Sequence, residues 1–373
     1  DMKIGIVGGG ATGLFLGKLL AMRGGHRVVI FEKSARAGRK IKASGGGRAN
    51  IFHLPVEAGQ YNRPDFVAGL LQQVDAEKMR QLWLSFGMPT CCDEEGRGYP
   101  MTYFSQTVLD VLLQELQPNV EIRYECEVKG IRSENGKWFI NNGTEQFDKV
   151  VLCSGSPAGL RLERAETYNT YLKPFKFATQ PLLPSLVGFR VQNPVRRLEG
   201  CRTKAEVSLY HRQRLLFREA GEVIFKADGI SGIVILNASS YYARLSDRSD
   251  CMLSLDFLYA HPEIDPKRHL QEFHTFNGLL HPKLNELFQR QPFDPKHFQL
   301  SIAGTYNWDE AQVCHGGICC SEVGDNLEAH RFPGLYIGGE MLDIDGVCGG
   351  YNLFFACACG YVIYKHINCF SEK

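Results

Sequence analysis

The sequence predicts an α/β fold in which both ends of the chain build one nucleotide-binding domain, with an antiparallel β domain and a small helical domain inserted between them. The distribution of glycine is the first observation behind this prediction: 12 of the 39 glycines lie in the first 50 residues, and a second cluster occupies 334–350. Glycine is used where a backbone turns sharply or approaches a ligand closely. The second observation is that residues between these clusters alternate polar and apolar, as in antiparallel strands.

Length and composition exclude several classes of protein. A chain of 373 residues predicts two to three domains. With 42 Lys and Arg against 41 Asp and Glu, the chain lacks the basic excess of a nucleic-acid binder. The longest apolar run, 353–364, is too short to span a bilayer, and the first strand reaches glycine too early for a signal peptide. An odd count of 13 cysteines, several in apolar segments, predicts free thiols and a cytoplasmic protein. From the charge balance and the short apolar run, we expect neither a nucleic acid nor a membrane as a partner.

The first element predicted is a strand over residues 3–7, followed by a glycine turn and a helix that ends at Gly24-Gly25. A second strand covers residues 27–32. The turn carries Gly8-x-Gly10-x-x-Gly13, and the second strand ends in Glu32. This is the dinucleotide fingerprint, in which glycines admit the pyrophosphate and the acid binds the ribose hydroxyls. By itself it does not distinguish FAD from NAD.

The second glycine cluster favours FAD. An apolar strand over residues 334–338 leads to Gly339-Glu340, whose carboxylate suits the hydroxyls of a ribityl chain, which NAD lacks. Gly349-Gly350-Tyr351-Asn352-Leu353 then opens an apolar helix predicted from about Asn352 to Lys365. A helix start directed at a flavin places partial positive charge near N1 and the C2 carbonyl, where the reduced ring is negative.

The middle of the chain predicts the remaining elements. Short strands over 121–131, 137–141 and 146–152 form a meander that returns to a buried strand. Residues 185–240 alternate as β strands, and apolar residues recur at helical spacing over 262–295. The predicted domains are therefore 1–172 with 314–373 for FAD, 175–240 with 296–313 for the β domain, and 241–295 for the helical domain.

These motifs resemble those of the BaiN-like bacterial flavoproteins, which include aminoacetone oxidases. The resemblance runs from end to end and rests on Ser44 to Asn50, on Gly221 to Gly232, on Ala311 to Ile318 and on Gly339 to Asn352. It implies a glutathione-reductase-like FAD-binding domain made from both chain ends. Motifs and resemblance together give these candidate cofactor residues: Gly8, Gly10, Ala11, Thr12, Gly13, Glu32, Lys33, Arg39, Lys40, Ser44, Gly46, Gly47, Arg48, Asn50, Val128, Ser154, Gly155, Gly339, Glu340, Asp345, Gly350, Tyr351, Asn352 and Leu353.

This sequence departs from the family pattern at two places. Ala49 stands where the family usually has Cys, and the glycine-rich stretch after the meander is reduced to Ser154-Gly155-Ser156-Pro157. Cys314 and Cys319 have the spacing of a redox disulfide or, with His315, of half a zinc site, but no second cysteine pair completes a knuckle. We expect no metal.

The predicted function is FAD-dependent hydride transfer between flavin and a small organic substrate, with catalytic residues not identified. No second strand-GxGxxG-helix unit is found, so electrons are expected from the substrate or from NAD(P)H docked transiently at the flavin. Two alternatives remain: a flavin-binding sensor or scaffold without turnover, and an NAD-dependent dehydrogenase without flavin.

Overall fold

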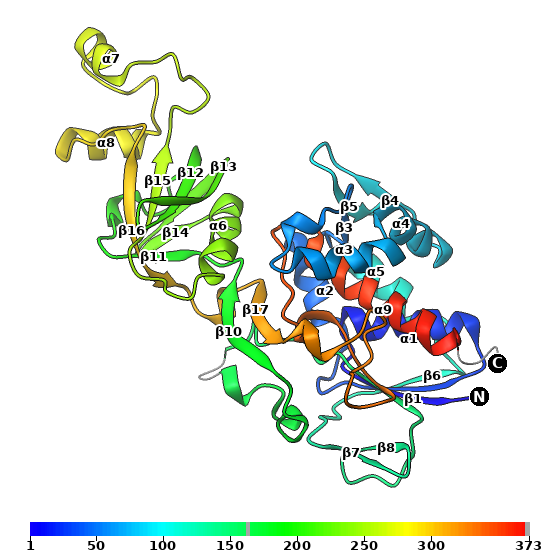
Figure 1. Ribbon diagram of the computed structural model, residues 1–373. Helices are drawn as coiled ribbons and strands as arrows, with labels where there is room; N and C mark the ends of the chain where they lie inside the picture. Colours follow the sequence, from blue (N-terminus) through cyan, green and yellow to red (C-terminus); the bar gives the residue numbers. More distant parts are fainter. Residues whose placement is uncertain (162–164, 370–373) are drawn as a thin grey trace. The chain divides into compact units, whose positions relative to one another are not determined.

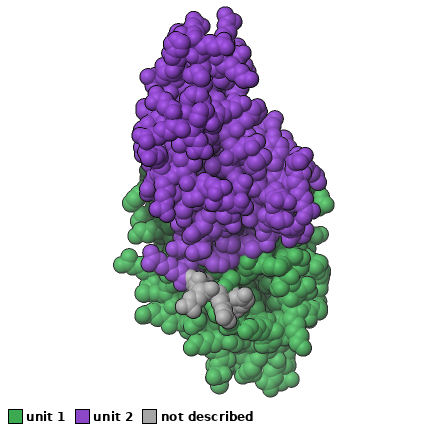
Figure 2. All heavy atoms as spheres, turned by 90° about the vertical axis from the view of Figure 1, so that its left-hand side faces the viewer, with its two compact units in different colours: residues 1–157, 162–182, 316–373 green, residues 158–161, 183–315 purple. Residues whose placement is uncertain are grey.

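A computed structural model describes residues 1–161 and 165–369, and the chain divides into two compact units. The first unit holds residues 1–157, 162–182 and 316–373, and the second holds residues 158–161 and 183–315 (Figure 2). The first contains both chain ends, as the two glycine clusters predict.

A five-stranded parallel sheet forms the centre of the first unit, with strand order β18-β9-β1-β2-β6. Strands β1 and β6 of this sheet are labelled in Figure 1. All four neighbouring pairs are parallel. Apart from the edge strand β6, its strands are mostly apolar, as expected when helices or loops cover both faces of a sheet. This is a Rossmann-type arrangement, and β18 shows that the C-terminal segment completes the sheet begun by the N-terminus. The strands are β1 (Lys3–Val7), β2 (Arg27–Phe31), β6 (Val120–Arg123), β9 (Lys149–Leu152) and β18 (Leu335–Ile337).

Helices α1 (Ala11–Arg23) and α9 (Tyr351–Cys369) pack closely against each other. Gly360 permits this contact, because a Cβ there would lie 3.1 Å from the Thr12 carbonyl oxygen. The Thr12 hydroxyl donates to the Ala356 carbonyl at 2.8 Å across the same contact. The remaining helices of this unit are α2 (Arg39–Ala43), α3 (Pro64–Gln73), α4 (Ala76–Ser85) and α5 (Ser105–Leu113).

Two small sheets complete the first unit. Strands β3 (Phe52–His53), β5 (Arg97–Pro100) and β4 (Thr90–Cys92) form one in that order, and β3 packs against α9. Strands β7 (Ile131–Glu134) and β8 (Lys137–Ile140) form an antiparallel hairpin. Short 3-10 helices lie between these elements at η1 (Ser44–Gly47), η2 (Ala58–Gln60), η3 (Ala165–Thr167), η4 (Thr170–Phe175), η7 (Cys320–Glu322) and η8 (Gly339–Met341).

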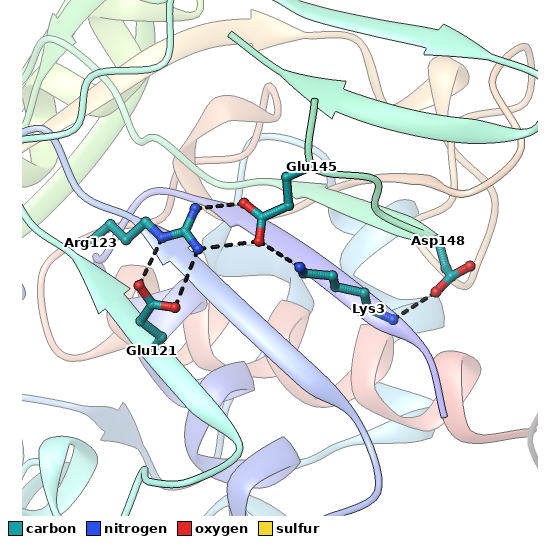
Figure 3. A network of polar contacts seen from close by, with 5 residues as sticks. All are labelled: Lys3, Glu121, Arg123, Glu145 and Asp148. Atoms are coloured by element: carbon teal, nitrogen blue, oxygen red, sulfur yellow. Dashed lines mark hydrogen bonds and ion pairs between the residues drawn. The ribbon is translucent and has the colours of Figure 1, made fainter. Parts of the chain in front are cut away.

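An ion network joins the edge strand β6 to β1 (Figure 3). Arg123 donates to Glu121 at 2.8 Å and to Glu145 at 2.6 Å, and Lys3 pairs with Glu145 at 2.5 Å. The Arg123 guanidinium lowers the pKa of Glu145 to about 2. The network also includes Asp148, which accepts from the Lys3 backbone N–H at 2.7 Å. Glu145 and Asp148 lie in the segment that leads from hairpin strand β8 to β9.

The second unit is built on a closed antiparallel barrel with strand order β11-β14-β13-β12-β15-β16. Its core includes Leu209, Val223 and Leu253 from the barrel strands and Leu284 and Leu287 from α8. Strands β10 (Thr179–Ser185) and β17 (Val313–Ile318), which carry the chain between the units, pair with each other. The other elements are β11 (Phe189–Val191), η5 (Arg196–Leu198), β12 (Arg202–His211), β13 (Arg214–Lys226), β14 (Gly229–Ser231), α6 (Ile233–Ala243), β15 (Cys251–Asp256), α7 (Pro266–Phe273), α8 (Pro282–Arg290), β16 (Phe298–Thr305) and η6 (Trp308–Glu310).

Two predicted details need correction. The single strand expected over 121–131 is instead β6, which ends at Arg123 and belongs to the parallel sheet, followed by a turn before β7. The range 241–295, expected to be helical, contains barrel strand β15, and Leu284 on its second helix joins the barrel core. The three-part domain division stays a prediction. Among the described residues, no helix is both long and apolar enough to cross a membrane.

Candidate functional site

The carboxyl ends of four parallel strands place the candidate residues at one edge of the sheet. Gly8 follows β1, Glu32 follows β2, Ser154 lies two residues after β9, and Gly338 follows β18. Ligands of open α/β sheets bind outside the carboxyl ends of the strands. The structure therefore brings residues from both glycine clusters of the sequence to the edge at which sheets of this kind bind ligands.

The three fingerprint glycines have different surroundings. A Cβ on Gly8 would lie 2.4 Å from the Cys153 carbonyl oxygen, and one on Gly13 would lie 2.0 Å from the Gly8 carbonyl oxygen. No described atom lies within 4 Å of the Cβ position at Gly10. Gly8 and Gly13 are therefore required by packing of the turn, whereas Gly10 leaves space that a ligand can fill.

The start of α1 offers an anion site beside Gly10. Its first turn carries no acidic residue, and its N-cap Gly10 has no side chain to satisfy the free amides. Amides at a helix N-terminus lack intrahelical acceptors and carry partial positive charge. A pyrophosphate suits this position. Gly46 and Gly47, at φ of +64° and +87°, likewise have no described atom within 4 Å of their Cβ positions. Open space beside Gly10, Gly46 and Gly47 leaves room for a long dinucleotide.

The Glu32 carboxylate is held in place by backbone amides. It accepts from Gly9 N–H at 3.0 Å and from Ser34 N–H at 2.8 Å. The backbone beside it is fixed as well, because Cys126 N–H donates to the Glu32 carbonyl at 2.9 Å. This contact brings the segment containing Val128, which is buried, to the same strand end. Glu32 is half-buried, so its carboxylate is oriented without being removed from solvent.

Lys40 connects the second glycine cluster to the strand ends. Its ammonium group pairs with Glu340 at 3.0 Å and donates to the carbonyl and hydroxyl oxygens of Ser156 at 3.1 and 3.2 Å. Lys40 belongs to α2, Ser156 follows β9, and Glu340 follows β18. The predicted residues Lys40, Glu340 and Gly155 therefore lie together.

Asn50 links the loop after η1 to the start of α9. Its amide donates to the carbonyls of Gly98 and Phe52 at 3.1 Å and accepts from the Gly350 N–H at 3.1 Å. Gly350 has a φ of +99°, and a Cβ there would lie 2.1 Å from the Phe52 carbonyl oxygen. Only glycine fits at position 350, because the backbone of β3 passes too close for a side chain. The Gly350 N–H is satisfied by Asn50, so it is not among the helix donors expected to face a flavin.

Several predicted side chains are occupied by contacts within the protein. Asn352 accepts from Gly346 N–H and donates to its carbonyl, both at 2.9 Å, so it holds the loop before α9. The Ser44 hydroxyl donates to the Ile41 carbonyl at 2.6 Å. Asp345 is fully buried. The side chains of these residues and of Thr12 stabilise the loops and helices around the candidate site. Their backbone groups can still bind a ligand there.

The remaining predicted residues surround the same edge. Lys33 lies 4.2 Å over the Tyr168 ring, Arg39 donates to the Ser34 hydroxyl at 3.4 Å, and Arg48 lies 5.6 Å from the Tyr99 ring centre. Burial lowers the pKa of Lys33 from its usual value. Ala11 is the first residue of α1 and Leu353 is the third residue of α9, and Gly339 has a φ of +72°.

A polar cluster that the sequence did not predict covers Ser154. Its hydroxyl donates to Asn169 Oδ1 at 2.7 Å and contacts the Tyr171 hydroxyl at 2.6 Å. Tyr168 donates to the Ser154 carbonyl at 2.8 Å, and Asn169 Nδ2 donates to the Gly155 carbonyl at 3.0 Å. The residues after Pro157 therefore fix the shortened glycine stretch in place. No periodic pattern in the sequence signals this, because the contacts come from an irregular segment.

The cysteines form no disulfide. All thirteen are free, including Cys314 and Cys319. Burial raises the pKa of Cys320 to about 12, which keeps this thiol protonated near neutral pH. Burial also raises the pKa of Cys153, which lies behind the glycine turn. These thiols are packed as small apolar groups, which gives no support to a redox-disulfide mechanism.

Comparison with known proteins identifies the family of this chain. The model of the HI0933-like protein Rossmann domain matches residues 2–366. The chain belongs to the HI0933-like family. It is 31% identical to a 3-dehydro-bile acid delta(4,6)-reductase of Clostridium scindens, over 96% of this chain and 97% of that protein. It is 27% identical to a ribosomal RNA dihydrouridine synthase of Escherichia coli, over 94% of each chain.

Solved structures share the fold at low sequence identity. The structure of 3-ketosteroid delta1-dehydrogenase from Sterolibacterium denitrificans superimposes with a TM-score of 0.54 and 11% identity, covering 99% of this chain and all of that one. Membership of the HI0933-like family, together with the Rossmann-type sheet and its glycine motifs, makes this chain an FAD-dependent oxidoreductase that acts on an organic substrate.

Proposed function

We propose that the chain binds FAD across the carboxyl ends of β1, β2, β9 and β18 and uses it to reduce a carbon–carbon double bond conjugated to a carbonyl group in a small molecule. The main support for the FAD site is a contrast among the glycines. A Cβ would clash with the protein at Gly8 and Gly13, whereas at Gly10, Gly46 and Gly47 it would meet open space. In this proposal the pyrophosphate lies at the start of α1, and Glu32 accepts from the ribose hydroxyls.

The rest of the cofactor is assigned to the second glycine cluster. Glu340, oriented by Lys40, binds the ribityl hydroxyls, and the backbone amides of Tyr351, Asn352 and Leu353 stand at the start of α9, where helix amides lack intrahelical acceptors. When bound, FAD supplies a ring that carries two electrons as a hydride. The chain's own contribution is to hold that ring, exclude water from it and orient the substrate.

The reaction class is inferred from the curated relatives. The name of one denotes a reductase of Δ4,6 double bonds in a 3-dehydro bile acid, and that of the other a synthase of dihydrouridine. Both names describe addition of hydrogen to a carbon–carbon double bond. We assign a small-molecule substrate, because 42 basic residues against 41 acidic residues give no excess for a nucleic-acid backbone. Cytoplasmic location and transient docking of NAD(P)H as the electron source belong to the same proposal.

An anaerobic reoxidation assay tests this function. The FAD-loaded protein is reduced with dithionite and mixed with 2-cyclohexenone, with progesterone as a 3-oxo-4-ene steroid, or with a uridine-containing RNA transcript. We expect the enones to reoxidise the flavin and the RNA to leave it reduced. Reoxidation by the RNA alone would overturn the small-molecule assignment. Failure of all three acceptors would favour a flavin sensor, and a colourless protein that binds NAD would favour the flavin-free dehydrogenase.

A further inference from the structure

His53 is the last residue of β3 and lies beside the start of α9. Its imidazole stacks on the Tyr351 ring, with ring centroids 4.8 Å apart and an interplanar angle of 16°. A Cβ on Gly349 would lie 3.4 Å from His53 Cδ2, so the ring also adjoins the glycines before the helix. His53 is half-buried, and β3 packs against α9. The imidazole is therefore placed at the end of the site assigned to the flavin ring.

The hydrogen bond at Nδ1 fixes which ring nitrogen is left for chemistry. His53 Nδ1 lies 2.8 Å from the Pro55 carbonyl oxygen. A carbonyl oxygen only accepts, so Nδ1 carries a proton in this bond, and Nε2 is the ring nitrogen that the bond leaves unused. The Cε1–Nε2 edge of the ring adjoins Gly96, because a Cβ there would lie 3.0 Å from Cε1 and 3.4 Å from Nε2. Stacking, hydrogen bond and packing together hold the imidazole in one orientation.

The neighbouring hydroxyl groups are poorer proton donors. The Tyr61 hydroxyl is buried and donates to the Tyr351 carbonyl at 2.7 Å. Burial raises the pKa of Tyr351 to about 12 and also raises the pKa of Tyr99. A guanidinium such as that of Arg48 does not release its proton in proteins. An imidazole, by contrast, exchanges protons readily in the physiological range of pH.

We propose that His53 is the catalytic proton donor to the substrate carbon. This inference rests on the proposed reduction of a conjugated double bond. Bound reduced FAD would supply the two electrons as a hydride to the β-carbon, with the carbon–carbon π bond breaking. The Nε2–H of the His53 imidazolium then gives its proton to the α-carbon, and the saturated ketone and oxidised FAD result. His53 becomes a neutral imidazole, and its Nδ1–H bond to Pro55 is unchanged, so the transfer needs no rearrangement.

The test compares His53→Gln with wild type and with His297→Gln, a control at an exposed histidine of the second unit. Dithionite-reduced, FAD-loaded protein is mixed anaerobically with 2-cyclohexenone or with ferricyanide, which accepts electrons without protonation of carbon. We expect His53→Gln to slow reoxidation by the enone by about 10²- to 10⁴-fold, the usual contribution of a general acid. Reoxidation by ferricyanide and FAD content should match wild type. In wild type, the enone rate should fall in D₂O.

A readout without substrate accompanies the kinetics. Nitrogen-15 NMR of labelled histidines should show several imidazoles in the Nδ1–H tautomer, because His261 Nδ1 faces the Glu263 carboxylate and His366 Nε2 accepts from the Asn326 amide. The signal of His53 is the one that should disappear in His53→Gln and persist in His297→Gln. An enone rate unchanged in His53→Gln overturns the proposal. Equal slowing with both acceptors, or loss of FAD from both His53→Gln and His53→Asn, also overturns it and assigns His53 a structural role. If wild type itself reduces no enone, the proposed function fails, and the inference fails with it.

Discussion

Substitution of Gly10 by Ala should separate cofactor binding from stability. Gly10 has φ of −91° and ψ of −162°, which alanine adopts without strain, and no described atom lies within 4 Å of its Cβ position. We expect the FAD-free protein to unfold with a free energy equal to wild type or higher by about 0.4–1 kcal/mol, because alanine reduces the entropy of the unfolded chain. FAD binding should weaken, because the new methyl group occupies the space assigned to the pyrophosphate.

The size of the binding defect follows from the hydrogen bonds at stake. A hydrogen bond from a backbone amide to a charged group contributes about 1.5–3 kcal/mol. Loss of one such bond at the start of α1 therefore raises the dissociation constant by about 10- to 100-fold. Fluorescence titration of the FAD-free protein measures this, and urea unfolding followed by circular dichroism measures stability.

Gly13→Ala is the matched control for this experiment. Its Cβ would lie 2.0 Å from the Gly8 carbonyl oxygen, so the turn must move. We expect the free energy of unfolding to fall by at least about 1–3 kcal/mol, the usual cost of overpacking. A Gly10→Ala protein that is folded and binds FAD as tightly as wild type would refute the placement of the pyrophosphate.

Three further predictions concern other described contacts. Glu32→Ala should weaken FAD binding by about tenfold or more, since a charge-assisted bond to the ribose is lost; titration showing unchanged affinity in the folded variant would contradict this. Burial lowers the pKa of His26, whose Nδ1 accepts from Met2 N–H at 3.2 Å. The unfolded chain therefore binds the proton more readily, and stability should fall as pH drops below the unfolded value of about 6.5. In urea melts, the free energy of unfolding should fall less with decreasing pH in His26→Gln than in wild type, because the nearby charges of Arg23 and Asp148 contribute less to the pKa shift than burial does. An identical fall in both proteins would exclude His26 as its source. Glu145→Gln removes the central carboxylate of the ion network in Figure 3 and should cost about 1 kcal/mol at low salt, and less in 1 M NaCl. An effect independent of salt would argue against an ionic origin.

Local patterns made the nucleotide-binding elements predictable. The strand, glycine turn and helix over residues 3–23 are encoded by neighbouring residues, and the predicted bounds of β1 match the structure. Strand β6 was misplaced because its pairing with β2 joins segments about 90 residues apart, and a parallel pairing leaves no signal in either strand alone. Strand β15 was missed because its alternation over Cys251–Asp256 covers only 6 residues, and these lie between the range 185–240 that alternates as strands and the helical spacing over 262–295.

The candidate site was predictable where it depends on glycine and less so where it depends on side chains. The glycines of both clusters converge on the strand ends as expected. The sequence could not predict the hydrogen bonds that Asn352 makes with Gly346 and that Asn50 accepts from Gly350. These bonds depend on the three-dimensional path of the chain around β3. His53 was overlooked for the same reason. It belongs to no sequence motif, and only the fold shows that it stacks on Tyr351 at the start of α9.

Hydrogen exchange measured with and without FAD tests the central claim most directly, namely that one FAD site is built from the strand ends of both chain termini. Addition of FAD to the FAD-free protein should slow amide exchange at residues 8–13 and 32–34 and, to a comparable degree, at residues 339–340 and 351–353. The barrel strand β12 serves as an internal reference for nonspecific stabilisation. Protection confined to residues 8–13 and 32–34, with the C-terminal segments exchanging as fast as without FAD, would contradict the account.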